Sequence, residues 1–258
     1  MNNQALERTD IREKVENYWD TRSDSYSQQN LAELHCFKRD AWRSIILENA
    51  PQKDKLRILD VGTGPGFFAI NLALAGHEVT AVDLASAMLQ KASENANHYG
   101  VKINFRQGNV HELPFPDEEF DLVLSRNVVW NLEEPERALK EWLRVIRKGG
   151  RILYFDANWY LHLFDDNLRT QYFQAQEEAD RRFARGVMPK TEMRIKMEDI
   201  ARNLPLSREY RPQWDQQALE RCNVKIIKIA ENIGDLVWNE EEKVRHRVTP
   251  MFMVCAEK

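Results

Sequence analysis

Short apolar runs alternate with segments of helical spacing between residues 57 and 155, and this alternation limits the possible folds more than any other feature. The apolar runs expected to form strands are 57–61, 78–82, 103–107, 120–125 and 151–155. The segments with helical spacing between them are 67–75, 85–99 and 134–146, and each is followed within a few residues by a glycine. A glycine directly after a helical segment is a common helix end. Strands and helices that alternate in this way predict a parallel sheet covered by helices on both faces.

The segments before and after this alternation predict helical additions to the sheet. Residues 1–50 are expected to form an N-terminal helical cap of two helices, separated by the polar, turn-like segment 21–30. Residues 158–220 are expected to form a helical insertion between the fifth and sixth strands. The two remaining strands are expected at 224–231 and 251–256. We therefore expect one domain over residues 1–258, with a doubly wound, mostly parallel seven-stranded α/β sheet and an antiparallel last strand.

Composition and charge favour a globular protein without nucleic acid or membrane partners. The chain has 258 residues, of which 43% are hydrophobic and 30% are charged, and its net charge is −4. Such modest acidity gives no electrostatic attraction to nucleic acids or anionic membranes. The start of the chain is polar, and no run reaches the roughly 18 apolar residues of a membrane span. We therefore expect a soluble, cytoplasmic protein, whose oligomeric state stays open.

The three cysteines indicate neither a disulfide framework nor a metal centre. Cys36, Cys222 and Cys255 lie far apart in the sequence, with no CxxC pair and no nearby pair of histidines. We therefore expect reduced thiols and no bound metal.

A glycine-rich turn after the first strand is the strongest functional signal. The segment LDVGTGPGF, residues 59–67, follows a strand and opens a helix, and Asp83 stands at the end of the next strand. Glycines allow the backbone to turn tightly and to approach a ligand, while helix N–H groups face it. An acidic side chain at Asp83 is placed to accept hydrogen bonds from both ribose hydroxyls of a nucleoside. The spacing is GxGxG, which differs from the GxGxxG of dinucleotide sites and from the phosphate-binding loop that ends in lysine.

Four separate segments resemble the motifs of class I S-adenosylmethionine-dependent methyltransferases, in the group of ubiquinone, menaquinone and other small-molecule enzymes. They are LDVGTGPGF, VTAVDLASAML, FRQGNVHELPFPDEEFDLVLSRNVVWNL and LRVIRKGGRILYFD. The resemblance covers residues 15–157 closely and the last two strands more loosely. It implies a Rossmann-like methyltransferase fold, S-adenosyl-L-methionine as cofactor with S-adenosyl-L-homocysteine as its product, and methyl transfer to a small molecule by in-line displacement.

The resemblance also implies roles for individual residues in binding the cofactor. The glycine turn would hold the methionine part, Asp83 the ribose, and Asn109 the adenine. In many relatives an aspartate at this last position accepts a hydrogen bond from the adenine amino group, and the carbonyl of Asn109 is expected to do the same. The cofactor-binding residues expected on these grounds are Tyr26, Asp60, Gly62, Thr63, Gly64, Gly66, Asp83, Leu84, Ser86, Met88, Asn109, Val110, Arg126 and Asn127.

No catalytic triad is expected, because the sulfonium of such a cofactor already activates the methyl group. The protein must hold an acceptor in line with the methyl, and a base is needed only where the acceptor carries a proton that must leave. Candidates for such a base are His162, His35 and Asp156. Substrate contacts are expected from Trp130, Trp159, Tyr160 and Tyr172, which lie at or beyond the active-site edge of the sheet. All of these residues have packing as their alternative role.

The helical insertion carries an excess of positive charge between residues 181 and 211. Nine basic residues minus four acidic ones leave +5 in a chain whose total is −4. A basic cap suits a substrate with a carboxylate or phosphate, and a solvated helical face is the alternative. The basic residues are Arg181, Arg182, Arg185, Lys190, Arg194, Lys196, Arg202, Arg208 and Arg211.

Three other functions stay open at this point. An RNA or protein methyltransferase would use the basic insertion as a docking surface, and a non-catalytic sensor of an adenosyl ligand would keep the same cofactor motifs. The segment SRNVVWNL has no proline pair, which disfavours methylation of the exocyclic amino groups of nucleic acid bases. A nicotinamide-dependent oxidoreductase is disfavoured by the GxGxG spacing and the expected antiparallel last strand.

Overall fold

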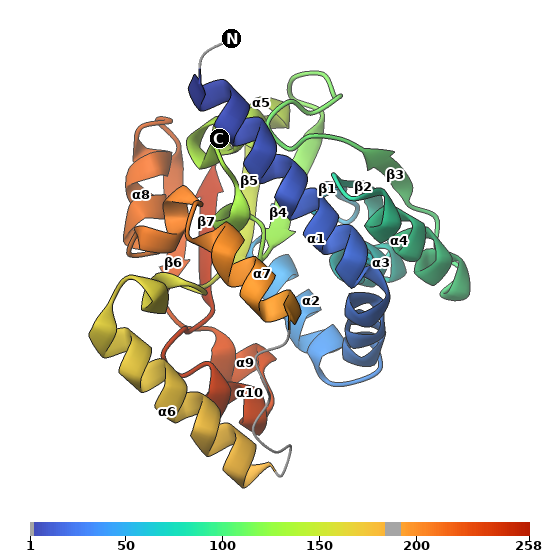
Figure 1. Ribbon diagram of the computed structural model, residues 1–258. Coiled ribbons are helices and arrows are strands. Elements are labelled where there is room, and N and C mark those ends of the chain that lie inside the picture. Colours follow the sequence, from blue (N-terminus) through green and yellow to red (C-terminus); the bar gives the residue numbers. More distant parts are fainter. Residues whose placement is uncertain (1–2, 184–191) are drawn as a thin grey trace.

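The fold is a seven-stranded sheet with helices on both faces (Figure 1). The computed structural model describes residues 3–183 and 192–258, with side chains from residue 10 onward. The strand order is β3-β2-β1-β4-β5-β7-β6, in which β7 runs antiparallel to both neighbours and all other pairs are parallel. The strands are β1 (Arg57–Val61), β2 (Glu78–Asp83), β3 (Asn104–Gln107), β4 (Phe120–Arg126), β5 (Ile146–Asp156), β6 (Lys225–Ala230) and β7 (Phe252–Glu257). The predicted doubly wound, mostly parallel sheet with an antiparallel last strand is thus confirmed.

Two hydrophobic cores lie on opposite faces of the sheet. Successive side chains of a strand point to opposite faces, so in β5 Leu153 and Phe155 join one core while Ile152 and Tyr154 join the other. The first core includes residues of α2 (Lys38–Asn49), α3 (Phe67–Leu74), α4 (Ser86–His98) and α9 (Gly234–Val237). The second core includes residues of α5 (Pro135–Val145) and α8 (Gln213–Glu220). Because both faces are covered, β1 and β4 are buried along almost their whole length.

Helix α1 (Asn3–Leu34) is one continuous helix, so the predicted turn at residues 21–30 is wrong. The polar side chains of this segment bond to the helix backbone or to α4 instead of ending the helix. Thr21 donates from its hydroxyl to the carbonyl of Asn17 at 2.8 Å, and Asn95 donates to the hydroxyl of Ser27 at 3.1 Å. The chain turns only at residues 35–37, after which α2 begins.

The chain between β5 and β6 is helical, as predicted for the insertion. Its elements are η2 (Leu161–Leu163), α6 (Asp166–Arg182), α7 (Glu192–Ala201), η3 (Pro205–Arg208) and α8. A third hydrophobic cluster joins this insertion to α1 and to η1 (Val129–Asn131): Met197 and Ile200 of α7 belong to it, and Val15 and Trp19 of α1 pack against it. The insertion therefore holds α1 across the front of the sheet in Figure 1. A further short helix, α10 (Glu240–Arg245), precedes β7 and was not expected from the sequence.

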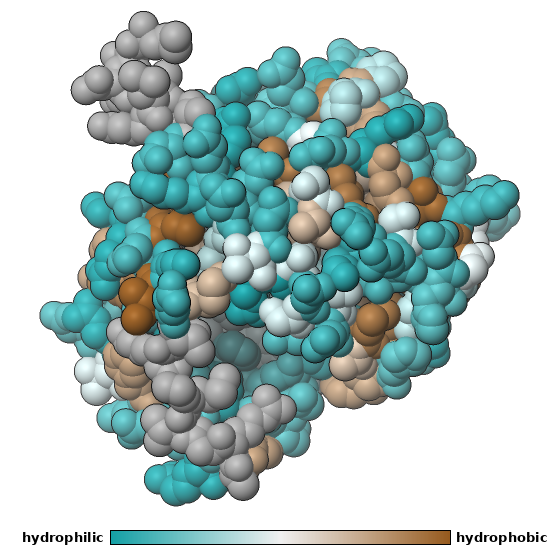
Figure 2. Space-filling model, turned by 45° about the vertical axis from the view of Figure 1, so that its right-hand side comes forward, coloured by the Kyte–Doolittle hydropathy of each residue, from teal (hydrophilic) through white to brown (hydrophobic). Residues whose placement is uncertain are grey.

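The surface gives little direct indication of function. The face in Figure 2 is mostly hydrophilic, with hydrophobic residues in scattered spots. Within residues 3–183 and 192–258, no helix is long and apolar enough to cross a membrane. The same part of the chain contains no group of three or more histidine, cysteine, aspartate or glutamate residues that could hold a metal ion. Polar side chains that can bind a ligand or take part in a reaction gather instead under α1, at one edge of the sheet.

Candidate functional site

The glycine turn between β1 and α3 adopts a conformation that requires glycine. Gly62, Gly64 and Gly66 have φ angles of 65°, 53° and 93°, in a region that other residues avoid. A Cβ atom on Gly62 would overlap Cγ2 of Val128, so a side chain there meets the neighbouring loop. At Gly64 a Cβ atom would meet only the ring of Tyr26, at 3.5 Å. The turn is therefore closely packed on one side, and Tyr26 of α1 lies over it.

Asp60 holds this turn from within. Its Oδ2 accepts hydrogen bonds from the Thr63 hydroxyl at 2.6 Å and from the backbone N–H of Ala69 at 3.1 Å. Burial raises the pKa of Asp60 to about 7, and these two hydrogen bonds oppose the rise. Asp60 thus ties the turn to the start of α3, whatever contact it also makes with a ligand.

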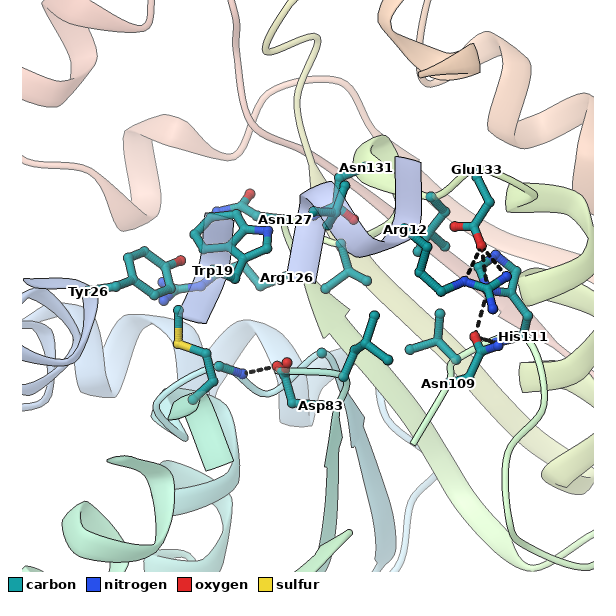
Figure 3. Close-up of a pocket in the computed structure, with 18 residues that line it drawn as sticks. Arg12, Trp19, Tyr26, Asp83, Asn109, His111, Arg126, Asn127, Asn131 and Glu133 are labelled. Carbon is teal, nitrogen blue, oxygen red and sulfur yellow. Dashed lines mark hydrogen bonds and ion pairs between the residues drawn. The ribbon is translucent and has the colours of Figure 1, made fainter. Parts of the chain in front are cut away.

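Asp83 stands at the end of β2 with its carboxylate turned toward the glycine turn (Figure 3). Its Oδ2 accepts from the backbone N–H of Gly64 at 2.7 Å, and its Oδ1 accepts from the backbone N–H of Ala85 at 3.0 Å. Burial raises the pKa of Asp83 to about 6, against the opposing effect of these donors. Each carboxylate oxygen keeps a second acceptor site, so both can bind hydroxyl groups of a ligand.

A cavity between α1 and the carboxyl ends of β1, β2 and β4 joins these features (Figure 3). Tyr26 and Trp19 lie at one end, Asp83 in the middle, and Asn109 and Glu133 at the other end. The residues that line it are Arg12, Val15, Trp19, Tyr26, Gly62, Gly64, Asp83, Leu84, Met88, Asn109, Val110, His111, Arg126, Asn127, Val128, Asn131, Leu132 and Glu133. The cavity lies where ligands of open α/β sheets are expected, beyond the carboxyl ends of the strands.

Most residues that the sequence assigns to the cofactor meet at this cavity. The ten that line it are Tyr26, Gly62, Gly64, Asp83, Leu84, Met88, Asn109, Val110, Arg126 and Asn127. Asp60 and Thr63 line a small adjoining hollow on the side of the glycine turn. Gly66 precedes α3 and Ser86 begins α4, and neither lines the cavity or the hollow.

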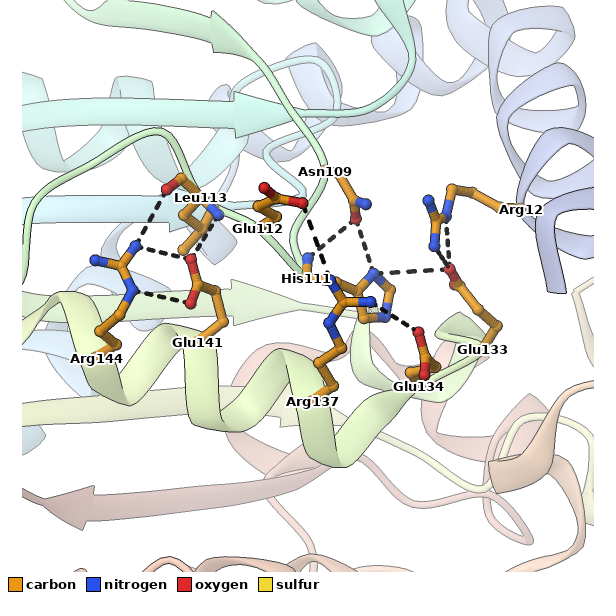
Figure 4. Close-up of polar contacts among 10 residues, drawn as sticks. All are labelled: Arg12, Asn109, His111, Glu112, Leu113, Glu133, Glu134, Arg137, Glu141 and Arg144. Atoms are coloured by element: carbon orange, nitrogen blue, oxygen red, sulfur yellow. Dashed lines mark hydrogen bonds and ion pairs between the residues drawn. The ribbon is translucent and has the colours of Figure 1, made fainter. Parts of the chain in front are cut away.

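The far end of the cavity is a polar network (Figure 4). Oδ1 of Asn109 accepts from the backbone N–H of His111 at 3.0 Å and from its ring Nδ1 at 2.8 Å. The same ring nitrogen lies 3.7 Å from Oε1 of Glu133, which accepts from Nε of Arg12 at 2.5 Å. Burial lowers the pKa of His111, which favours the neutral ring. In this structure Oδ1 of Asn109 already bonds to His111, and the expectation that the same oxygen accepts from a ligand stays a prediction.

Arg126, at the end of β4, places a buried positive charge beside the glycine turn. It donates to Oε2 of Glu33 at 2.8 Å, and its guanidinium lies 4.5 Å from the ring centre of Phe67. Burial alone would raise the pKa of Glu33, but the charges of Arg126 and Lys38 hold it below its usual value. Since Arg126 lines both the cavity and the adjoining hollow, its charge is available to an anionic group bound there.

The three candidate bases lie away from the cavity. His162 stacks on Tyr172 with ring centres 3.9 Å apart, and it lines a separate hollow under α6 and α7. His35 is hydrogen-bonded through Nε2 to the hydroxyl of Tyr99 at 3.0 Å. Asp156 is fully buried and forms an ion pair with Arg211 at 2.7 Å. In this structure all three have structural partners and none lines the cavity, so their role as bases stays a prediction.

The aromatic residues expected to touch a substrate are packing residues in this structure. Trp130 donates from Nε1 to the carbonyl of Asn127 at 3.0 Å, and its ring centre lies 4.9 Å from that of Tyr160. Trp159 donates to Asp156 at 3.1 Å. Together with Tyr172, they join the insertion to the loops after β4 and β5, and none of the four lines the cavity.

Eight residues line the cavity that were not assigned to the site from the sequence. They are Arg12, Val15, Trp19, His111, Val128, Asn131, Leu132 and Glu133. His111 could have been found, because it follows Asn109 by two residues within a recognised motif. Arg12 and Glu133 carried no such signal, because they are separated by 121 residues.

Several basic residues of the insertion are buried or paired with carboxylates. Arg211 is fully buried between two carboxylates. Three other basic residues form ion pairs within their helices, namely Arg182 with Glu178, Arg194 with Glu198 and Lys196 with Glu192. Arg185 and Lys190 lie outside the described residues. An anionic substrate therefore gains little support from the count of charges.

Comparison with known proteins matches the part of the chain that contains the glycine turn and Asp83. The methyltransferase domain family matches residues 59–154. An uncharacterized methyltransferase of Bacillus subtilis is 32% identical over 113 residues, 43% of this chain and 45% of that protein. Malonyl-[acyl-carrier protein] O-methyltransferase of Erwinia pyrifoliae is 35% identical over 50% of this chain and 46% of its own length. Demethylmenaquinone methyltransferase of Thermus thermophilus is 36% identical over 45% of this chain and 53% of its own length. The chain thus spans about half the length of these relatives.

Solved structures extend the likeness of fold to nearly the whole chain. The methyltransferase in a complex with the Haloferax volcanii Trm112 methyltransferase activator has a TM-score of 0.62 and 16% identity, over 93% of this chain and 96% of that one. A SAM-dependent methyltransferase of Aquifex aeolicus has a TM-score of 0.54 and 18% identity, over 87% of this chain and 92% of that one. Residues 59–154 therefore match a methyltransferase domain, in a chain whose fold is similar to that of a SAM-dependent methyltransferase.

Proposed function

We propose that the chain transfers a methyl group from S-adenosylmethionine to a small-molecule acceptor by in-line displacement. The observation that carries this proposal is the cavity that runs from the glycine turn past Asp83 to Asn109 and Glu133. A backbone turn, a carboxylate with open acceptor sites and a polar far end suit the methionine, ribose and adenine parts of the cofactor, in that order. When bound, the cofactor supplies a methyl group that its sulfonium has already activated.

In this proposal the residues of the chain bind the cofactor and orient it for the displacement. Asp83 accepts hydrogen bonds from the ribose hydroxyls, and Arg126 supplies the charge opposite the methionine carboxylate. Tyr26 of α1 lies over the turn, Trp19 packs beside it with ring centres 5.4 Å apart, and the two exclude water. Orientation and exclusion of water lower the barrier to displacement without a covalent nucleophile.

A small acceptor is supported by one of the relatives and by the cap. One matched relative is a demethylmenaquinone methyltransferase. The cluster that joins α1 to α7 covers the edge of the sheet above the site. We propose that residues 1–258 act as one methyltransferase domain, in which residues 1–50 and 158–220 form the cap over a small substrate.

A methyl-transfer screen tests the proposed function. The full chain is incubated with S-adenosylmethionine labelled in the methyl group and with cell extract separated into small metabolites, protein and RNA. We expect label in the small-metabolite fraction, and none with the Asp83→Ala variant. Label in the protein or RNA fraction alone would contradict a small-molecule acceptor.

Cofactor affinity is expected to fall in acid, because Asp83 must be ionised to accept hydrogen bonds from both ribose hydroxyls. Since burial raises the pKa of Asp83 to about 6, its carboxylate is ionised above that pH and becomes protonated below it. We expect S-adenosylhomocysteine to bind about ten-fold more weakly at pH 5 than at pH 7.5, measured by calorimetry. The pKa of Asp60 is raised to about 7, so an Asp60→Asn variant that still binds should keep the transition near pH 6. Affinity that is constant over this range would contradict the role of Asp83.

A further inference from the structure

The insertion contains a second hollow, between η2, the first turns of α6 and the end of α7. Its volume is about 380 Å³. The residues that line it are His162, Leu163, Arg169, Phe173, Glu198 and Arg202. None of them lines the cavity at the glycine turn or the small hollow that adjoins that turn. A small molecule bound here would therefore occupy a site separate from that cavity.

The wall of this second hollow is mostly apolar. Leu163 is buried, and Phe173 is 39% exposed. Phe164, which follows Leu163, is also exposed, and the guanidinium of Arg208 lies 4.6 Å from the centre of its ring. A mainly apolar wall with a few polar groups is typical of sites for small molecules. The wall therefore suits the apolar body of a ligand, and the polar groups around it decide the class of that ligand.

Arg169 places a fixed guanidinium at the hollow. Its Nε donates to the carbonyl of His162 at 3.1 Å, and its Nη2 donates to the carbonyl of Leu163 at 2.8 Å. Its Nη1 lies 2.8 Å from Oδ1 of Asp166. A guanidinium has five N–H donors, so two of them remain after these three contacts. Because backbone carbonyls already hold the side chain, binding an anion costs little further ordering of Arg169.

Arg202 brings a second guanidinium that lacks a carboxylate partner. Within residues 10–183 and 192–258, no aspartate or glutamate forms an ion pair with it. The carboxylate of Glu198, in the same wall, accepts from Nε of Arg194 at 3.0 Å. The planar guanidinium of arginine matches the two oxygens of a carboxylate. The hollow thus presents an apolar wall beside a positive charge that no described carboxylate neutralises.

His162 closes the buried side of the hollow. It is 3% exposed, and its ring stacks on that of Tyr172 with centres 3.9 Å apart. Its Nδ1 is buried and has no hydrogen-bond partner in the described part of the chain, which is unusual for a buried polar atom. Burial lowers the pKa of His162 to about 4, so the ring is neutral near pH 7. The positive charge of the hollow therefore comes from the two arginines.

We propose that this second hollow is a binding site for a small carboxylate with an apolar body, such as an aromatic acid. The body packs on Leu163 and Phe173, and the carboxylate accepts hydrogen bonds from Arg202 and from the remaining donors of Arg169. An uncharged amide of the same shape lacks the charge, and inorganic phosphate lacks the apolar body. This inference does not depend on the proposed function, because the hollow and the cavity at the glycine turn share no lining residue.

Benzoate is the probe, and benzamide is its uncharged counterpart of equal shape. Both are titrated onto the full chain by saturation-transfer NMR, with and without S-adenosylhomocysteine. A ligand of this size is expected to bind with a dissociation constant of about 1–10 mM. We expect benzoate to bind about ten-fold tighter than benzamide, because a hydrogen bond to a charged group is stronger than one to a neutral group. An equal concentration of inorganic phosphate should displace little of the benzoate.

Two variants locate the bound benzoate. Arg202→Gln should weaken benzoate by about ten-fold and leave benzamide unchanged, whereas Phe173→Ser should weaken both ligands. Arg181→Gln is the matched control, because Arg181 is an exposed arginine of α6 that does not line the hollow. Arg202 and Phe173 are both exposed, so these variants should keep the fold, which thermal melting checks.

The results that would overturn the inference are distinct. Absence of saturable benzoate binding, equal affinity for benzoate and benzamide, or an Arg202→Gln variant that binds benzoate like the wild type would each contradict the site. Loss of benzoate binding when S-adenosylhomocysteine is added would place the benzoate in the cavity at the glycine turn instead. Displacement by an equal concentration of phosphate would contradict the role of the apolar wall. None of these results bears on methyl transfer.

Discussion

Replacing Asp83 by alanine is expected to weaken the binding of S-adenosylhomocysteine by about 100-fold or more. In the proposed complex the carboxylate accepts hydrogen bonds from both ribose hydroxyls, and a hydrogen bond to a charged group contributes about 1.5–3 kcal/mol. Its two oxygens also accept from the backbone N–H groups of Gly64 and Ala85. The substitution therefore removes the ribose contact and one restraint on the glycine turn. Calorimetric titration at pH 7.5 measures the effect.

The matched control for this variant is Asp54→Ala. Asp54 is an exposed aspartate before β1 that does not line the cavity. It should bind the ligand like the wild type and show the same thermal stability. Wild-type affinity in the Asp83→Ala variant would place the ribose elsewhere and would remove the basis of the assigned site.

Replacing Arg211 by methionine is expected to destabilise the fold by about 3–5 kcal/mol. The side chains of Arg211, Asp156 and Asp215 are fully buried, and Arg211 pairs with both carboxylates at 2.7 Å. Asp215 also accepts from the hydroxyl of Tyr154 at 2.9 Å. Removing one partner of a buried ion pair leaves uncompensated charge in the interior, and this cost exceeds that of a surface pair. The midpoint and slope of urea unfolding measure the loss.

Arg221→Met provides the comparison on the surface. Arg221 pairs with Glu136, and both side chains are about half exposed, at 49% and 46%. Exposed pairs of this kind contribute about 0–1 kcal/mol, so the unfolding midpoint should hardly move. Equal losses in the two variants would contradict the view that the buried cluster anchors the insertion to β5.

The sheet could be predicted from the sequence because its signals are local. The apolar run before the glycine turn gave β1 with its observed bounds, Arg57–Val61. The same kind of signal failed at residues 21–30, where polar side chains normally favour a turn. In α1 these side chains bond to carbonyls one turn earlier or to α4, and such tertiary contacts cannot be read from local composition.

The candidate site was predictable only where a motif carried it. Asp83 and the glycine turn follow from their positions after strands. Asp156 is also at a strand end, and this position made it a candidate base in the sequence. In the structure it is paired in the interior with Arg211, which lies 55 residues later. The pairing of Arg12 with Glu133 depends on how α1 lies across the sheet, which no sequence pattern fixes.

Calorimetric titration of the full chain with S-adenosylhomocysteine and with NAD tests the central claim most directly. The cavity offers a GxGxG turn and a ribose carboxylate, so we expect saturable binding of S-adenosylhomocysteine at one site and no binding of NAD at the same concentration. Tight binding of NAD with no binding of the adenosyl ligand would contradict the account.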